Sequence, residues 1–349
     1  MAWLMAGAGA VSAQPNGPAP DSPAGRAVDC PTLGSATRSW ASTGGQDHPL
    51  VGTAISAGTG ASLPLAAFAD TLAAALPPAG RFILLGEVHD NPDHHALRAR
   101  LIRELACRAT APKAAVFEHI RADQQSALDR FAGPGATAQP PGTGTDLMRL
   151  LDWDNSGWPA ARMFLPLLDA VLGAGLTILP GDPARSTVRA LARGEAGAVA
   201  ADVRARLRLD EPLPQPLADA LAIELKDSHC GMLPETAIPA LALAQRYRDA
   251  HQADAMLAAS ATYGVTLLLA GNGHVRADRA VPWHIRQRAP AAGIVTVSYV
   301  EVEDGRTDPL AYLPRAPDGT AAVDYIVFTP RAARPDPCEM MRPRKSGRG

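Results

Sequence analysis

The chain has 349 residues, of which 33 are basic and 35 acidic, giving a formal net charge of −2, and 47% of its residues are apolar. This length and apolar fraction allow one large α/β domain or two small ones with a full core. No basic stripe interleaved with aromatic residues is present, so nucleic acid is not an expected partner. None of the four cysteines lies in a C-x-x-C pair, which excludes a thiolate zinc knuckle.

The N-terminus has the features of a secretory signal. Residues 2–11 are small and apolar, and Ser12 and Ala13 precede a pattern close to a cleavage site. The positively charged region that usually begins a signal peptide is missing. The alternative interpretation is a disordered Ala/Gly-rich tail. We therefore expect residues 1–13 to be a signal peptide of an exported, periplasmic bacterial protein. No other apolar stretch reaches about 18 residues, so we expect no membrane span.

Residues 14–48 are rich in Pro, Gly, Ser and Thr and are expected to form a flexible linker before a domain over residues 49–330. Helical spacing alternates with short apolar runs inside this domain. The predicted elements are, in chain order, a helix over 64–76, a strand over 81–85, a helix from 92 to about 108, a strand over 113–120, helices over 121–132 and within 145–173, a strand over 175–182, helices over 184–193, 198–208, 216–229 and 236–259, and strands over 264–274, 291–302 and 324–330. The last segment, 331–349, is expected to be a disordered basic tail.

This order of elements predicts an α/β fold. Strands separated by helices indicate a mainly parallel sheet with flanking helices. The run "RFILL" is apolar throughout, as a parallel strand buried on both faces should be. Residues from about 184 to 262 contain only helical patterns, which predicts a smaller all-helical subdomain.

Two predicted strands end in the same motif. "RFILL" is followed by "GEVH" and "TLLLA" by "GNGH", so that Gly-x-x-His recurs at Gly86 to His89 and at Gly271 to His274. Glycine permits the backbone to turn sharply after the strand. Parallel strands end at one sheet edge, which is where open α/β folds bind their ligands. We therefore expect His89 and His274, far apart in sequence, to converge.

Acidic residues accompany these two histidines. Glu87 lies two positions before His89, so an extended backbone points both side chains the same way. A neighbouring strand, "VFEHI", offers Glu118 or His119. The set Glu87, His89, Glu118 and His274 is a mixed nitrogen and oxygen cluster that suits Zn, Mn or Fe(II). Without a metal, the same four residues could act as paired acid and base.

Other polar segments have two interpretations each. His94 and His95 begin a helix and are either solvated or part of the site. "HCGMLP" is a helix stop, yet His229, Cys230 and Met232 are also soft, metal-capable side chains. In "QRYRDA", Arg248 either forms a surface ion pair or points at a carboxylate or propionate in a cleft.

The aromatic residues and cysteines allow fewer conclusions. Trp153 and Trp158 are expected in the core or in the wall of a cleft. Export would permit disulfides, and one between Cys30 and Cys338 would join the two ends of the chain, although the sequence does not fix the pairing. Cys107, on the apolar face of a helix, is expected to be a buried thiol.

Several of these segments resemble the ChaN-like family of haem-binding, iron-uptake-associated proteins, in a superfamily with the Tiki, TraB and erythromycin-esterase proteins. The matching pieces cover about residues 50–330, and they are "LLGEVHDNPDHHALRARLIREL", "AVFEHIRADQQSALDRF", "LDWDNSGWP", "HCGMLP", "QRYRDA" and "LLLAGNGHVRADRAVP". The resemblance implies an α/β domain with a helical part, and an active region at Glu87, His89, Glu118 and His274. It also makes His229, Met232, Arg248 and Arg276 candidate cofactor-binding residues. The chain departs from the family in lacking a lipobox and in carrying Gln252 where a methionine is expected.

Three functions follow from these observations. The favoured one is non-covalent haem binding in iron acquisition, by an exported protein with its ligand site at the carboxyl edge of the sheet; no C-x-x-C-H motif for covalent attachment is present. The alternative is a hydrolase of ester or peptide bonds that uses the His/Glu cluster, with or without a divalent metal. The third is a catalytically inactive fold kept for protein contacts. A homodimer is compatible with each of the three.

Overall fold

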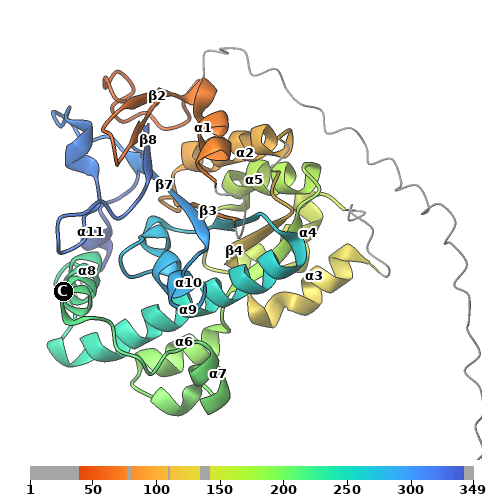
Figure 1. Ribbon diagram of the computed structural model, residues 1–349, viewed down its shortest axis with the longest axis vertical. Coiled ribbons are helices and arrows are strands. Elements are labelled where there is room, and N and C mark those ends of the chain that lie inside the picture. The colour runs from red at the N-terminus through yellow and green to blue at the C-terminus, as the bar shows by residue number, and fades with distance from the viewer. Residues whose placement is uncertain (1–38, 77–80, 109–110, 134–141, 342–349) are drawn as a thin grey trace, which may run out of the picture.

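The fold is built on one eight-stranded sheet. The computed structural model describes residues 39–76, 81–108, 111–133 and 142–341. Its strand order is β2-β1-β8-β7-β3-β6-β4-β5 (Figure 1). The strands are β1 (Thr53–Ser56), β2 (Ser62–Pro64), β3 (Arg81–Leu85), β4 (Ala114–Arg121), β5 (Thr177–Asp182), β6 (Thr266–Leu269), β7 (Gly293–Glu301) and β8 (Tyr325–Thr329). Six of them, from β8 to β5 in this order, pair in parallel, and β1 pairs antiparallel with both β2 and β8. This mainly parallel sheet confirms the predicted fold class.

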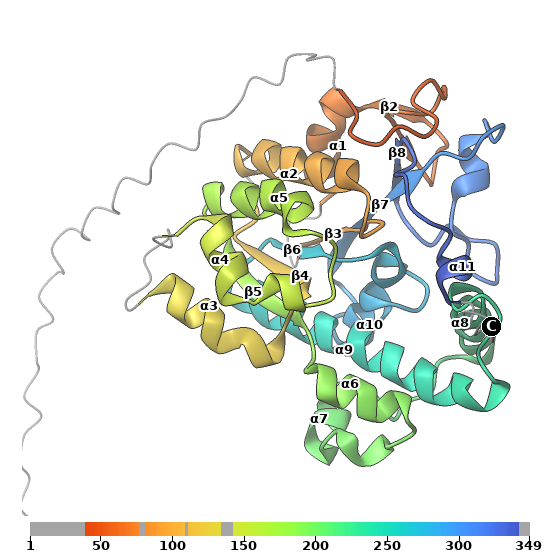
Figure 2. The same cartoon turned by 180° about the vertical axis from the view of Figure 1, so that it is seen from behind.

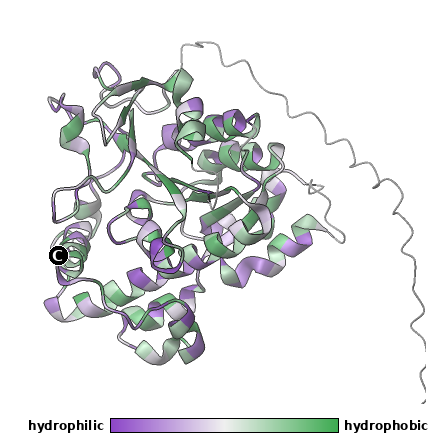
Figure 3. Ribbon diagram, in the orientation of Figure 1, coloured by the Kyte–Doolittle hydropathy of each residue, from purple (hydrophilic) through white to green (hydrophobic). Residues whose placement is uncertain are grey.

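Helices cover both faces of the sheet (Figures 1 and 2). One apolar cluster joins the sheet to the helices α1 (Phe68–Ala75), α2 (Pro92–Ala106), α3 (Gln125–Ala132), α4 (Gly144–Leu150) and α5 (Ala161–Gly173). A second cluster joins the other face to α9 (Ile238–Tyr263) and α10 (Val281–Arg288). Successive residues of β3 alternate between these two clusters, as the pleat of a strand requires. The apolar sheet therefore lies between two helical layers (Figure 3).

Every regular element between residues 184 and 262 is helical. This part contains α6 (Arg185–Ala192), α7 (Ala201–Arg206), α8 (Gln215–Ser228) and most of α9, with a small core of its own around Leu191, Leu207 and Tyr247. The long helix α9 belongs to both parts, because its first half packs in this small core and its second half packs on the sheet. It therefore connects the helical region directly to the strands.

The turn after β3 is built as the sequence suggests. Asn91 caps α2, since its side chain accepts hydrogen bonds from the backbone N–H groups of Asp93 and His94, and Pro92 occupies the first helical turn. Such capping satisfies backbone donors that the helix leaves free at its start. The strand, the polar turn and the helix thus follow one another within a dozen residues.

The predicted boundaries of the domain need correction at both ends. Residues 39–48 were expected in the linker, but Ser42 is buried and its N–H donates to Asp93 at 2.8 Å. Residues 331–341 were expected in a disordered tail, but Arg334 pairs with Glu301 and Asp90. The predicted signal peptide and residues 14–38 lie outside the described residues. The short antiparallel strands β1 and β2 were not predicted, because neither "TAIS" nor "SLP" is a continuous apolar run.

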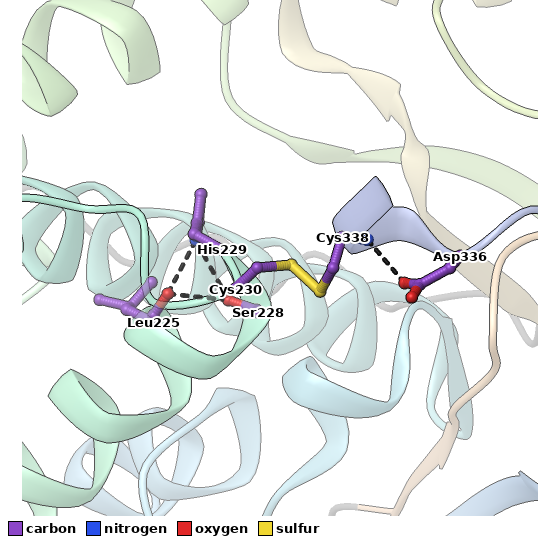
Figure 4. The surroundings of a disulfide bond; sticks show 6 residues. All are labelled: Leu225, Ser228, His229, Cys230, Asp336 and Cys338. Atoms are coloured by element: carbon purple, nitrogen blue, oxygen red, sulfur yellow. Dashed lines mark hydrogen bonds between the residues drawn. A yellow bond between two sulfur atoms is a disulfide. The ribbon is translucent and has the colours of Figure 1, made fainter. Parts of the chain in front are cut away.

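Of the pairings that the sequence left open, the one between Cys30 and Cys338 is excluded. Cys338 forms a disulfide with Cys230, so it cannot join Cys30 (Figure 4). Cys107 is not a buried thiol: it is half-buried and takes part in a disulfide. Within the described ranges, no helix is both long and apolar enough to cross a membrane.

Candidate functional site

The two Gly-x-x-His turns meet at the carboxyl edge of the sheet, because β3 and β6 are parallel neighbours. Asn272, in the second turn, donates its backbone N–H to Glu87 O at 2.9 Å, and its side chain bonds Tyr299 O and Ser298 on β7. A Cβ on Gly86 would lie 2.9 Å from a methyl group of Val275, too close for any residue but glycine. Glycine at position 86 therefore lets the second turn approach the first.

Glu87 is the centre of the first half of the site. Its Oε1 lies 2.8 Å from His89 Nδ1 and 2.8 Å from His119 Nε2, and all but the His89 ring is buried. Both imidazoles therefore donate an N–H to the same carboxylate oxygen. Burial lowers the pKa of His119 and of His89, so both rings are neutral at neutral pH.

A buried arginine stands behind Glu87. Arg98, on α2, pairs with Glu87 Oε2 and donates to Leu85 O. It also donates to His95 Nδ1 at 2.9 Å, while His95 Nε2 donates to His89 O at 2.8 Å. The guanidinium neutralises the carboxylate, and His95 holds the backbone of the turn. A buried charge is tolerated only with such partners.

His89 is the member of the site that reaches solvent. Its side chain is 37% exposed, and its ring packs against Trp158 at 4.9 Å between centroids. Since Nδ1 donates to Glu87, the lone pair lies on Nε2, which is 3.9 Å from Glu118 Oε1. A Cβ on Gly271 would come within 3.0 Å of this nitrogen, so only glycine leaves room for the ring.

Glu118 is the centre of the second half. Its Oε2 accepts the Gly271 N–H at 2.6 Å, and its Oε1 lies 2.7 Å from Arg248 Nη2 and 3.1 Å from His274 Nε2. Burial alone would raise the pKa of Glu118, but His274, His89 and Arg248 hold it well below its usual range. The side chain is therefore a carboxylate fixed on three sides.

His274 lies between two carboxylates. Its Nδ1 is 2.7 Å from Asp249 Oδ1, opposite the contact with Glu118. Burial opposes a charge on the ring, but Glu118 and Asp249 outweigh it and raise the pKa of His274 to about 10. The ring is thus an imidazolium at neutral pH, with both nitrogens donating and no lone pair for a metal.

Helix α9 supplies one wall of this half. Arg248 and Asp249 are successive residues of α9, and Gln252 follows one turn later, 3.4 Å from His274 Nδ1. Arg248 also bonds Asp182, at the end of β5, at 2.8 Å. The interpretation of Arg248 as a surface ion pair is wrong, because its partners are the buried Glu118 and the nearly buried Asp182.

The remaining predicted residues lie elsewhere. Within the described chain, neither His229 nor Met232 forms a hydrogen bond or ion pair with the cluster; His229 bonds Leu225 O at the end of α8, and Met232 is exposed. Arg276 pairs with Asp278 and bonds Arg315 O. The structure therefore brings together Glu87, His89, Glu118, His274 and Arg248, but not the other three.

One interpretation held that His94 and His95 are solvated, and this interpretation is wrong. Both are buried, and burial lowers the pKa of His94 to about 3 and that of His95 to about 4. His94 accepts the Val88 N–H and bonds Thr329. Both rings are therefore neutral, and their hydrogen bonds hold the backbone of the turn in place.

The aromatic residues form a wall beside the site. Trp158 packs against both His89 and His119, at 4.9 and 4.6 Å, and Phe164 packs against His119 at 4.7 Å. Trp153 stacks on His119 from further away, at 6.2 Å. The prediction that Trp153 and Trp158 lie in the core or in a cleft wall is confirmed.

Sequence reasoning missed three charged residues of the site, which are Asp182, Arg98 and Asp249. Asp182 could have been found, since it too is a polar residue that follows a strand. Arg98 gave no signal, because an arginine on a helix is ordinarily exposed. Glu87, His89 and His119 could together hold a metal ion, because one ligand atom from each lies within 4.8 Å of the others.

Comparisons with known proteins agree with this architecture. Residues 74–285 match the family described as haem-binding uptake, Tiki superfamily, ChaN. The fold is similar to that in a structure of cofacial haem binding to ChaN of Campylobacter jejuni, with 19% identity, a TM-score of 0.58, and coverage of 78% of this chain and 95% of that one. A Bacillus cereus protein is 14% identical over 67% of this chain and 68% of that one, with a TM-score of 0.34. No curated protein matches the chain at a significant level.

The fold and the site define a three-layer α/β protein with paired Gly-x-x-His turns at the carboxyl edge of its sheet. The family match covers more than half of the chain. The chain belongs to the ChaN family of the Tiki superfamily.

Proposed function

We propose that this protein binds haem non-covalently, as an exported protein in iron acquisition, with its ligand site at the carboxyl edge of the sheet. The observation that carries the proposal is the match of residues 74–285 to a haem-binding uptake family. The solved relative from Campylobacter jejuni, a haem-bound ChaN, supports it.

The residues at the edge fit an iron-bound macrocycle. An axial imidazole needs one nitrogen with a lone pair and the other held by a hydrogen bond. His89 has this arrangement, because Glu87 holds Nδ1 and leaves Nε2 without a proton. Trp158 adds an aromatic wall beside the ring, as an apolar ligand face requires.

The chain's own residues position this imidazole. Glu87 fixes the tautomer of His89, and Arg98 is the buried counter-ion that pairs with Glu87. Gly271 leaves space for the ring, and His95 anchors the backbone of its turn. Bound haem would supply an iron centre that accepts the axial nitrogen and a broad apolar surface.

A haemin titration followed at the Soret band tests the proposal. Wild-type protein should give a saturable, shifted band, and His89→Ala should weaken binding at least tenfold. His251→Ala is the control, since His251 bonds Gly181 O on β5 and not the cluster. If His229→Ala or Met232→Ala abolishes binding while His89→Ala does not, the ligand site lies at the end of α8 instead. Size-exclusion chromatography with and without haemin tests whether the protein forms a homodimer.

A second candidate function rests on a different observation. The ligand atoms of Glu87, His89 and His119 lie close enough together for one divalent ion, which would activate water for hydrolysis of an ester or peptide bond. Elemental analysis of the isolated protein separates the two proposals. Stoichiometric zinc or manganese without a haemin response would favour the hydrolase.

The disulfides support the proposal of export. Cys230 and Cys338 are bonded to each other, and Cys107 is disulfide-bonded too. Such bonds persist in the periplasm and other oxidising compartments and are rare in the cytosol of most bacteria. Fractionation of the native host tests this: the protein should appear in the periplasmic fraction.

A further inference from the structure

The segment after β8 connects two sides of the site. We call residues 330–341, which end in α11 (Pro337–Met341), the C-terminal strap. It leaves the sheet beside β7 and reaches the end of α8, next to which α11 lies (Figures 1 and 2). Its two ends are held in different ways.

At its start, the strap is bonded to the turn that carries His89. Arg334 donates to Asp90 at 2.8 Å, and also to both oxygens of Glu301. Glu301 in turn accepts from Asn91, whose side chain also donates to Pro330 O at 3.0 Å. Asp90 and Asn91 directly follow His89, so this network fixes the far end of the turn.

At its end, the strap is bonded to the helical hairpin of α8 and α9. The Cys230–Cys338 disulfide joins them, and Cys230 lies between the two helices (Figure 4). Within the described residues, no hydrogen bond or ion pair runs from the strap to α8 or α9. The disulfide is therefore the covalent attachment on which this contact depends.

The hairpin carries the opposite wall of the site. Arg248 and Asp249 of α9 hold Glu118 and His274. Glu224 of α8 pairs with Arg279, a few residues beyond His274. The strap thus links the His89 turn on one side to the helices that hold His274 on the other.

We propose that the C-terminal strap is a thiol-operated latch that holds the site closed while the Cys230–Cys338 bond is intact. The proposal rests on the proposed function, because the site it controls is the haem site of that proposal. Reduction would release the strap from the hairpin, loosen the His89 turn and speed the release of ligand. The bond would thereby make binding depend on the redox state of the compartment.

The chemical step is ordinary thiol–disulfide exchange with a dithiol. One thiolate of the dithiol attacks a sulfur of the Cys230–Cys338 bond and displaces the other cysteine as a thiolate, forming a mixed disulfide. The second thiol of the reagent then displaces the protein sulfur and closes its own ring. Two electrons and two protons pass to the protein, which is left with two thiols.

Two measurements test the latch. The Cys230→Ser/Cys338→Ser variant removes this bond and leaves the disulfide of Cys107 in place, which a chemical reductant would not. Amide hydrogen exchange of residues 86–91 and 331–341, read without ligand, should become at least tenfold faster than in the oxidised wild type. Haemin transfer to an excess of a haem-scavenging protein should become at least fivefold faster.

Two further variants keep the test decisive if the double variant does not fold. Arg334→Gln keeps the disulfide but removes the ion pairs with Asp90 and Glu301, and it should also speed exchange in residues 86–91. Arg331→Gln is the matched control. Arg331 lies on the same strap, but the variant removes only its exposed ion pair with Asp304, so both rates should stay within twofold of wild type.

Unchanged exchange in residues 86–91 in the folded double variant would overturn the latch, and so would haemin release within twofold of wild type in that variant. If the double variant does not fold, unchanged exchange in these residues in Arg334→Gln would overturn it. If no form of the protein binds haemin, the proposed function fails, and the exchange rates alone decide whether the latch exists.

Discussion

At the scale of single residues, the site depends on a charge pair buried behind it. Glu87 and Arg98 are both buried, and each is the other's counter-ion. Removing one partner of such a pair leaves an uncompensated charge in a medium of low dielectric. The pair therefore acts on the position of His89 and on the stability of the whole fold.

We expect Glu87→Gln to lower the free energy of unfolding by about 3–5 kcal/mol, because Arg98 would lose its carboxylate. Urea unfolding at neutral pH measures this change. The control is Glu303→Gln, which removes an exposed pair with Arg306 and should cost no more than about 1 kcal/mol. Equal losses in the two variants would contradict the importance of the buried pair.

Two glycines of the second turn offer a sharper comparison. A Cβ on Gly271 would lie 2.9–3.0 Å from the His89 ring, whereas one on Gly273 would meet nothing nearer than 3.5 Å. Gly271→Ala should push His89 from its rotamer at a cost of about 0.5–1.5 kcal/mol, which weakens haemin binding about 2- to 10-fold. Gly273→Ala should leave the affinity unchanged. Identical Soret titrations of both variants would show that the ring of His89 does not position the ligand.

At the scale of elements, the sequence predicted the sheet and the convergence of the two turns. Continuous apolar runs revealed β3, β4 and β6, and the Gly-x-x-His motif after β3 and β6 placed His89 and His274 at one edge. Strands β1 and β2, at one end of the sheet, were missed because they are short and only partly buried. Local patterns reveal burial on both faces but not the pairing of such short strands.

The ordered conformation of the C-terminal strap could not be predicted either. Its sequence, "PRAARPDPCEMM", has no branched aliphatic or aromatic residue, and it is held by Arg334 and a disulfide rather than by a core. Long-range bonds of this kind leave no periodicity in the sequence. The same holds for Arg98, whose partner is eleven residues away on another element.

The Cys230–Cys338 bond closes a long loop, since 108 positions separate the two cysteines. Loss of a native disulfide of this span typically costs about 2–5 kcal/mol, largely through the greater freedom of the unfolded chain. We expect the Cys230→Ser/Cys338→Ser variant to unfold at a lower urea concentration by a matching amount. An unchanged midpoint would contradict a structural contribution of this bond.

At the scale of the whole molecule, buried neutral histidines set the response to acid. Burial lowers the pKa of His94 to about 3 and that of His95 to about 4, and burial next to Arg246 and Arg288 lowers the pKa of His284 to about 3. These groups titrate near pH 6.5 once unfolded. Below that pH the unfolded chain binds more protons than the native one, so stability falls as the pH falls.

We expect the free energy of unfolding to fall as the pH drops below about 6.5. It should also fall as the pH rises from about 7 toward 10, because only the native state keeps the proton of His274 there. Each such histidine contributes about 1.4 kcal/mol per pH unit near pH 5. The variant His284→Gln should reduce this slope by about one proton, and it lies on α10, apart from the cluster. Urea unfolding between pH 7 and pH 5 gives the slope, and an undiminished slope in this variant would show that His284 accepts a proton in the native state.

The central claim is that the haem iron binds at the carboxyl edge of the sheet, at His89. Anomalous X-ray scattering at the iron edge, from crystals of the haemin-loaded protein, locates the iron directly. The account predicts iron bound to His89 Nε2, beside Trp158. Iron bound at His229 or Met232, at the end of α8, with His89 left without a metal, would contradict it.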